Sequence, residues 1–205
     1  MDRLLLTTAY FPPISYVSAL IHAEEVYIEQ YENFGKQSYR NRCEIMTANG
    51  VIPLTVPVEK ANSKTLTKDL KIVYATNWQK LHFKGIESAY KNSPYYEYYI
   101  DDLVPFFEKK ETFLLDLNQK ITKTILEMLR IKKDILYTSD YIPVGTEEYL
   151  DFRSVFHPKA SHRTVGDNYT AKPYRQIFCD RIPFVANLSI LDLLFCCGTD
   201  AKEFL

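Results

Sequence analysis

The first 30 residues alternate short apolar runs with turn residues, and this pattern predicts a β-α-β unit. Leu4–Ala9 reads as a first strand, which Pro12-Pro13 ends because proline has no backbone N–H to donate. Ser15–Ala23 is expected to form a short helix, and Glu25–Glu29 a second strand. Ligands of open α/β sheets bind beyond the carboxyl ends of the strands, so the polar turn after the first strand is a candidate site.

Two further apolar runs, Cys43–Ala48 and Val51–Val56, flank Asn49-Gly50 and predict a β-hairpin. Asn-Gly is the strongest short-range hairpin signal, because both residues tolerate positive φ. Pro53 and Pro57 cannot donate ladder hydrogen bonds, so the second arm is expected at the edge or end of a sheet.

Three longer segments have helical character: Asn77–Lys91, Tyr95–Glu108 and Thr112–Ile131. The third keeps an apolar stripe over its whole length. Ile135–Thr138 then reads as a strand, and this return from helix to strand is typical of another parallel crossover.

The C-terminal part of the chain is less regular. Gly145–Ala171 is polar, and only a short helix near Glu147–Leu150 is expected within it. Leu188–Cys197 is expected to be a final helix, closed by Gly198. The whole pattern predicts one α/β domain over residues 1–205, with a mixed sheet flanked by helices; an α+β arrangement is the alternative.

Composition and charge argue against several classes of function. The 205 residues carry a formal net charge of -1 and a pI near 6.4, so we expect no general attraction to nucleic acid or anionic membranes. We expect neither a signal peptide nor a membrane span, because no apolar run is long enough. The four cysteines lack CxxC spacing, which favours reduced thiols and a cytoplasmic protein. No group of His, Cys, Asp and Glu has metal-ligand spacing, so no tightly bound metal is expected. Whether the protein uses a cofactor is left open.

His82 is the first candidate for chemistry. It lies on one helical stripe with Trp78, Gly85 and Ala89 and should therefore point inward. A core histidine bonded to a backbone carbonyl is the commoner arrangement. However, Gly85 and Ala89 leave room for a ligand, beside which His82 would serve as a general base.

The stretch SYRNRCEI supplies Arg40, Asn41 and Arg42 just before the hairpin. An arginine fork binds phosphate or carboxylate, and an asparagine side chain pairs with hydroxyl or amide groups. If this stretch is functional, Asn41 or Arg42 should share a cleft with His82. The alternative is that His82 is sealed in the core and that Arg42 pairs with a carboxylate such as Glu44 or Glu59.

Two further features are weighed in the C-terminal part. Asp192 lies in an almost wholly apolar helix, which suggests catalysis, but the spacing Ser189-x-x-Asp192 is that of a capping box and favours a structural role. A basic series could close over an anionic ligand, although scattered surface charge is the commoner outcome. The series comprises His157, Lys159, His162, Arg163, Lys172 and Arg175.

Three blocks, in order and across nearly the whole chain, resemble the WbqC-like protein family. They are SYRNRCEI with NGVIPLTVPVE, NWQKLHFKGIESAYKNSPYYEYY, and RQIFCDRIPFVANLSILDLLFCCG. The family pattern opens H-Q-P-x-Y-x-P, of which only Tyr10-Phe11-Pro12 remains here. Leu6, Thr7 and Thr8 stand in its first three positions, so a catalytic histidine there would be missing from this member. Leu81 is an extra residue before His82.

The resemblance implies a bacterial protein of surface-polysaccharide or O-antigen biosynthesis with a sugar or nucleotide-sugar ligand. One hypothesis is an enzyme, a transferase that moves a group to an amino-sugar with His82 as general base. The other is a non-catalytic scaffold that binds a glycan or a partner protein; a homo-oligomer is left open. The expected substrate-binding residues are Tyr10, Asn41, Arg42, Tyr90, Gln176 and Asp192.

Overall fold

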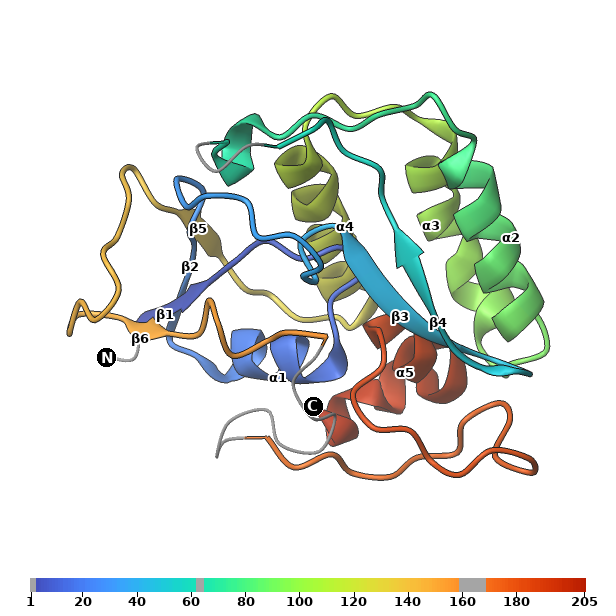
Figure 1. Ribbon diagram of the computed structural model, residues 1–205. Coiled ribbons are helices and arrows are strands. Elements are labelled where there is room, and N and C mark those ends of the chain that lie inside the picture. The colour runs from blue at the N-terminus through green and yellow to red at the C-terminus, as the bar shows by residue number, and fades with distance from the viewer. Residues whose placement is uncertain (1–2, 62–64, 159–168) are drawn as a thin grey trace.

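A four-stranded parallel sheet in the order β5-β2-β1-β6 forms one half of the protein (Figure 1). The structure is a computed structural model that describes residues 3–61, 65–158 and 169–205. β1 (Arg3–Leu6) and β2 (Glu25–Ile28) pair in parallel and are joined by α1 (Ile14–His22), which confirms the predicted β-α-β unit.

The remaining two strands lie at the edges of this sheet. β5 (Ile135–Tyr137) pairs in parallel with β2, as the predicted crossover requires. β6 (Leu150–Asp151) pairs in parallel with β1, on the side away from β2. The helix expected near Glu147–Leu150 is therefore wrong, because a two-residue strand carries no periodicity and is held only by the open edge of β1. The strand order reverses between β1 and β6, at the kind of switch point where α/β sheets bind ligands.

The predicted hairpin forms a separate two-stranded antiparallel sheet. β3 (Arg42–Thr47) pairs with β4 (Gly50–Thr55), and Thr47 lies opposite Gly50. The loop residues are consequently Ala48 and Asn49, one position earlier than predicted. Gly50 takes the positive φ, 106°, which costs glycine little because it has no Cβ.

The longer helices belong to the half of the molecule that contains the hairpin. α2 (Trp78–Tyr90) and α3 (Tyr96–Glu108) lie beside the hairpin, away from β5 and β6 (Figure 1). α4 (Leu114–Met128) and α5 (Ile190–Cys197) complete this half. All of these helices begin and end close to the predicted positions, so the predicted α/β fold with parallel and antiparallel strand pairs is confirmed.

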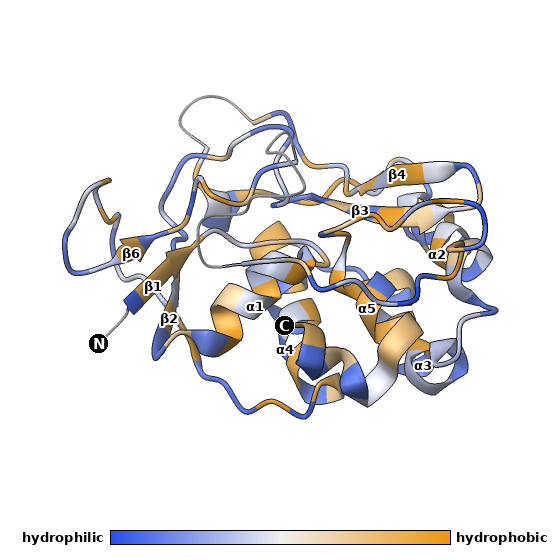
Figure 2. Ribbon diagram, turned by 90° about the horizontal axis from the view of Figure 1, so that it is seen from below, coloured by the Kyte–Doolittle hydropathy of each residue, from blue (hydrophilic) through white to orange (hydrophobic). Residues whose placement is uncertain are grey.

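Two apolar cores follow this division. The larger core packs the hairpin against α2, α3, α4 and α5, and the smaller one packs β1 and β2 against α1. α5 is apolar over most of its surface, as its position inside the larger core requires (Figure 2). Within the described ranges, no helix has the length and apolar character needed to cross a bilayer.

Candidate functional site

A cavity of about 600 Å³ opens at the carboxyl ends of β2, β5 and β6, and we call it the edge cavity. Its volume lies within the range of roughly 300–1,000 Å³ typical of small-molecule sites. Its position beside the switch point is the one that open α/β sheets use for ligands. The edge cavity is lined by Tyr31, Glu32, Asn33, Arg40, Leu66, Tyr141, Val144, Asp151, Arg153 and Ser154.

Behind this cavity, Glu29 ties the strand ends together. Its carboxylate is fully buried and accepts hydrogen bonds from the Tyr31 amide at 2.8 Å and the Thr138 hydroxyl at 3.1 Å. The Ile142 amide donates to its other oxygen at 2.9 Å. Because these donors follow two different strands, the cavity has a rigid back wall.

The Arg153 guanidinium forms a fork with Asp151 inside the cavity. Its Nε lies 2.8 Å from one carboxylate oxygen and its Nη2 2.5 Å from the other. These hydrogen bonds lower the pKa of Asp151 and keep the carboxylate charged. Nη1 donates to the Ile142 carbonyl, and the guanidinium lies 5.6 Å from the ring centre of Tyr141. Arg153 is thus held on several sides before any ligand arrives.

Glu32 and Arg40 make the second charged pair of the cavity. The Nε and Nη2 atoms of Arg40 donate to Oε1 of Glu32 at 3.0 and 2.7 Å. Oε2 takes neither bond. Burial raises the pKa of Glu32, although the guanidinium of Arg40 opposes this shift. Glu32 is therefore a cavity carboxyl group that can exchange a proton closer to neutral pH than an exposed one.

The charges around the edge cavity nearly balance. Three carboxylates (Glu29, Glu32 and Asp151) stand against two guanidinium groups, and Lys68 lies over the Tyr31 ring at 4.5 Å. Each guanidinium is already bound to a carboxylate. The cavity therefore offers many donors and acceptors without excess positive charge. This suits a polyhydroxylated ligand better than a bare anion.

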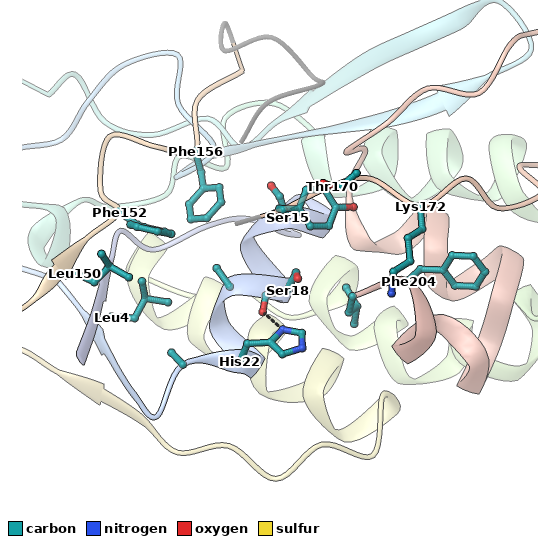
Figure 3. A pocket seen from close by; sticks show the side chains of 14 residues that line it. Leu4, Ser15, Ser18, His22, Leu150, Phe152, Phe156, Thr170, Lys172 and Phe204 are labelled. Atoms are coloured by element: carbon teal, nitrogen blue, oxygen red, sulfur yellow. Dashed lines mark hydrogen bonds between the residues drawn. The ribbon is translucent and has the colours of Figure 1, made fainter. Parts of the chain in front are cut away.

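β6 separates the edge cavity from a second one. Side chains alternate along a strand, so Asp151 and Arg153 face the edge cavity while Leu150 and Phe152 face the other side. There they line a mainly apolar cavity of about 470 Å³ (Figure 3), which we call the apolar cavity. Its lining comprises Leu4, Ser15, Ser18, Ala19, His22, Ala23, Leu150, Phe152, Phe156, Tyr169, Thr170, Lys172, Phe204 and Leu205.

The residues predicted from the sequence fall into two groups, and the first meets at the end of β4. The Tyr10 hydroxyl and Nδ1 of His82 lie 2.9 Å apart, and His82 also bonds to the backbone of Thr55. Arg42 is the ladder partner of Thr55. Asn41 pairs with the next residue, Val56. The structure thus brings the SYRNRCEI stretch and His82 to one place.

The environment of this first group is that of the core. His82 is only 5% exposed, and burial lowers its pKa to about 4. The side-chain amide of Asn41 donates to the Val56 carbonyl at 2.9 Å, and Arg42 donates to Glu44 at 3.1 Å. Glu44 is a partner that the structural alternative gave Arg42, and none of these residues lines the edge cavity or the apolar cavity. The roles of Tyr10, Asn41, Arg42 and His82 stay predictions.

The second group surrounds Asp192, which is fully buried in α5. Its carboxylate accepts from the Tyr90 hydroxyl at 2.9 Å, the Tyr174 hydroxyl at 2.5 Å and the Gln176 amide at 3.0 Å. Desolvation raises the pKa of Asp192, and these three donors oppose the shift. The group joins α2, α5 and the segment before α5, and its ligand-binding role stays a prediction.

The capping prediction at α5 is half confirmed. The Ser189 hydroxyl accepts from the Leu191 amide at 3.3 Å and caps the helix. Asp192 does not return to the Ser189 amide, which instead donates to the Glu44 carbonyl. The Asp192 carboxylate instead accepts hydrogen bonds from Tyr90 and Tyr174, because their hydroxyl groups lie on that side of α5.

Of the charged residues of the edge cavity, Arg40 was weighed from the sequence with Asn41 and Arg42, whereas Glu32, Asp151 and Arg153 were missed. Glu32 follows the second strand, so the preference of ligands for the carboxyl ends of strands could have identified it. Asp151 and Arg153 were hidden because β6 was not predicted. Of the basic series, Lys172 lines the apolar cavity, whereas Lys159, His162 and Arg163 lie outside the described residues.

Fold and site together define an α/β protein with a cavity at the carboxyl edge of a parallel sheet. The chain belongs to the WbqC-like protein family, whose model matches residues 8–163. All residues that line the edge cavity fall within this segment, whereas Gln176 and Asp192 fall beyond it.

Similarity to individual proteins adds one relative. The chain is 26% identical over 225 residues to the uncharacterized protein Rv1507c of Mycobacterium tuberculosis, covering 98% of this chain and 96% of that protein. No solved structure matches the chain.

Proposed function

We propose that the protein is an enzyme of bacterial surface-polysaccharide and O-antigen biosynthesis that binds a sugar in the edge cavity and transfers a group to an amino-sugar. The observation that carries this proposal is the pair of arginine–carboxylate forks facing one cavity, Arg40 with Glu32 and Arg153 with Asp151. They supply hydrogen-bonding groups of both kinds in fixed positions, which a ring of hydroxyl and amine groups requires.

Aromatic side chains complete such a sugar site. Tyr31 and Tyr141 line the cavity, and Tyr141 is 47% exposed. A tyrosine combines an apolar ring face with a polar tip, so it can contact the C–H face of a sugar and still bond to a hydroxyl. Asn33 and Ser154 add uncharged partners at the same wall.

Glu32 is the general base of the proposed transfer. The sugar amine attacks the acyl carbon of an activated acyl donor, and a new N–C bond forms. The donor's leaving group departs with the electron pair of the broken bond, and Glu32 accepts the proton released by the amine. Its raised pKa brings its basicity nearer to working pH, and Arg40 holds the carboxyl group in position.

Binding is tested by thermal unfolding in the presence of nucleotide sugars, free amino-sugars and acyl donors. A ligand at 100 times its Kd should add about 2.7 kcal/mol of stability. Tyr141→Ala should reduce this gain at equal ligand concentration. Tyr98→Ala should leave it unchanged, because Tyr98 is 65% exposed on the distant α3. Absence of any shift across the whole ligand set would overturn the proposal.

Catalysis is tested with the same ligands. Glu32→Gln should keep sugar binding and lower the transfer rate by about 100-fold or more. The role predicted for His82 enters here too: if His82→Asn folds and transfers the group at the wild-type rate, His82 is not the base. If Glu32→Gln instead transfers the group at the wild-type rate, Glu32 is not the general base.

A non-catalytic scaffold is the second candidate, and one observation favours it. Large apolar side chains stand exposed around the sheet edges, including Tyr141 at 47% and Val144 at 79%. Such side chains could contact a glycan or a partner protein. Sugar binding without transfer from any acyl donor would select this function.

A further inference from the structure

We propose that the apolar cavity binds a single hydrocarbon chain that ends in an acidic group. This inference goes beyond the proposed sugar chemistry, because the apolar cavity shares no lining residue with the edge cavity. Its tests are independent of those for the proposed function.

One end of the apolar cavity is built from hydrocarbon. Leu4, Leu150, Phe152 and Phe156 converge there from β1, β6 and the segment that follows β6 (Figure 3). The rings of Phe152 and Phe156 meet edge to face with centroids 5.9 Å apart. Leu4 and Phe156 also belong to the smaller core, so these walls are fixed by packing. Only an apolar group gains by entering this end.

The opposite end carries basic side chains. Lys172 lies there beside Phe204, away from Phe152 and Phe156, and His22 projects into the cavity from α1 (Figure 3). The Lys172 ammonium donates to the Glu203 carbonyl at 2.6 Å, and His22 Nδ1 bonds to the Ser18 carbonyl at 2.8 Å. Among the residues that the structure describes, no Asp or Glu side chain lines the cavity. An acidic head group is therefore the complementary one.

A buried hydroxyl supports a ligand on independent grounds. Ser15 is fully buried, and its Oγ has no hydrogen-bond partner among the described residues. The Asn187 side chain accepts from the Ser15 amide at 2.9 Å and fixes this turn of α1. Ser15 and Thr170 lie beside each other at the cavity wall (Figure 3). Buried polar groups are rarely left unpaired, so a head-group oxygen is the expected partner of Ser15.

The volume of the apolar cavity sets the size class of the ligand. About 470 Å³ is within the usual range of roughly 300–1,000 Å³ for small-molecule sites. Head and tail must fit together in this space, with the head towards Lys172 and the tail towards Phe152. This orientation predicts that affinity depends on chain length and on head-group charge as separate contributions.

The first experiment is calorimetric titration of the whole chain with alkyl carboxylates and alkyl phosphates of six to twelve carbons, below their micelle concentrations. We expect one site and a Kd that tightens about three- to fourfold for each added methylene until the cavity is full. The alcohol of equal length should bind about tenfold more weakly. The ratio of carboxylate to phosphate affinity identifies the head group. A Kd independent of chain length would overturn the proposal, as would several weak sites in place of one.

Two variants test the two ends. Ala19→Phe should fill the cavity and abolish chain binding, whereas Ala19→Ser at the same position of α1 should retain it. Lys172→Gln should weaken the acids about tenfold and leave the alcohols unchanged. The matched control is Lys123→Gln, on the 78% exposed lysine side chain of α4, and it should change neither. If the acids bind equally well to wild type and to Lys172→Gln, Lys172 does not bind the acidic head group.

The two proposals fail separately. Ala19→Phe should leave any sugar-dependent stabilisation intact, and Tyr141→Ala should leave chain binding intact. If Ala19→Phe does not fold, the chain-length series and Lys172→Gln still decide the question, because Lys172 is exposed and bonds only to a backbone carbonyl in the described structure.

Discussion

The hydroxyl of Tyr10 and the ring of His82, 72 residues apart in the sequence, meet at 2.9 Å inside the larger core. Tyr10 follows β1, and His82 lies in α2, so this hydrogen bond joins the two halves of the molecule. Trp78 packs edge-on against the His82 ring at a centroid distance of 5.1 Å. The ring of His82 is therefore held neutral and in one orientation.

This neutral histidine makes stability depend on pH. The pKa of His82 is about 4 in the folded protein against 6.5 in an unfolded chain. Between pH 4 and pH 6.5, His82 binds a proton in the unfolded chain but not in the folded protein. Neutral His82 thus contributes about 3 kcal/mol to the free energy of unfolding above pH 6.5, and this contribution is lost as the pH falls towards 4. Urea unfolding should show this additional loss between pH 7 and pH 4 in the wild type and not in His82→Gln; equal losses would contradict it.

Two glycines should respond to alanine in opposite directions. Gly198 has a φ of 60°, and a Cβ there would stand 2.5 Å from the Tyr95 ring, so Gly198→Ala should cost about 2 to 4 kcal/mol. Gly85 lies inside α2, where a Cβ would meet Leu54 at an ordinary 3.6 Å. Gly85→Ala should therefore stabilise the protein by about 0.5 to 1 kcal/mol.

Chemical denaturation of both variants checks this pair of expectations. A stable Gly198→Ala protein would show that the Tyr95 ring can move aside. A strongly destabilised Gly85→Ala protein would show that the α2–hairpin contact is tighter than the 3.6 Å separation indicates.

The buried Asp192 should make Tyr174→Phe a costly substitution. The change removes one of three donors to the carboxylate, at 2.5 Å, and should cost about 1 to 3 kcal/mol. The loss should be larger at pH 8 than at pH 4, because burial raises the pKa of Asp192 above 3.8 and only the ionised carboxylate needs every donor. Tyr98→Phe, on an exposed tyrosine, is the control and should be neutral. A Tyr174→Phe protein as stable as the control at both pH values would contradict this account.

Asn41→Ala should be destabilising even without a ligand. The Asn41 side chain is the donor to the buried Val56 carbonyl, and removing it leaves that carbonyl unpaired at a cost of about 1 to 3 kcal/mol. Asn49→Ala, in the exposed hairpin loop, should change the free energy of unfolding by less than about 0.5 kcal/mol. Equal unfolding midpoints for the two variants would argue against a structural role for Asn41.

The sequence predicted most of the fold because most elements have local signals. The stripe of α4 and the turn at Gly50 are readable within a few residues. β6 is not, since its two residues become a strand only by pairing with β1. The space beside His82 at Gly85 cannot be judged from the helix alone, because the neighbour that borders it, Leu54, comes from the hairpin.

The candidate site was harder to predict for a related reason. Polar residues near apolar stripes, such as Asp192 and His82, attract attention in a sequence, yet here Asp192 bonds to Tyr90 and His82 to Tyr10 inside the core. The edge-cavity residues Glu32 and Arg153 come from segments distant in the sequence, and only the sheet order brings them together.

Because β6 presents Asp151 to one side and Leu150 to the other, the length of the preceding segment fixes both surroundings at once. Inserting or deleting a single residue between 143 and 149 would turn β6 over by one position. Asp151 and Arg153 would then face the apolar cavity, and Leu150 and Phe152 would face Glu32 and Arg40. The spacing of this loop is therefore a shared constraint on the two cavities, and evolution can alter neither lining through it without disturbing the other.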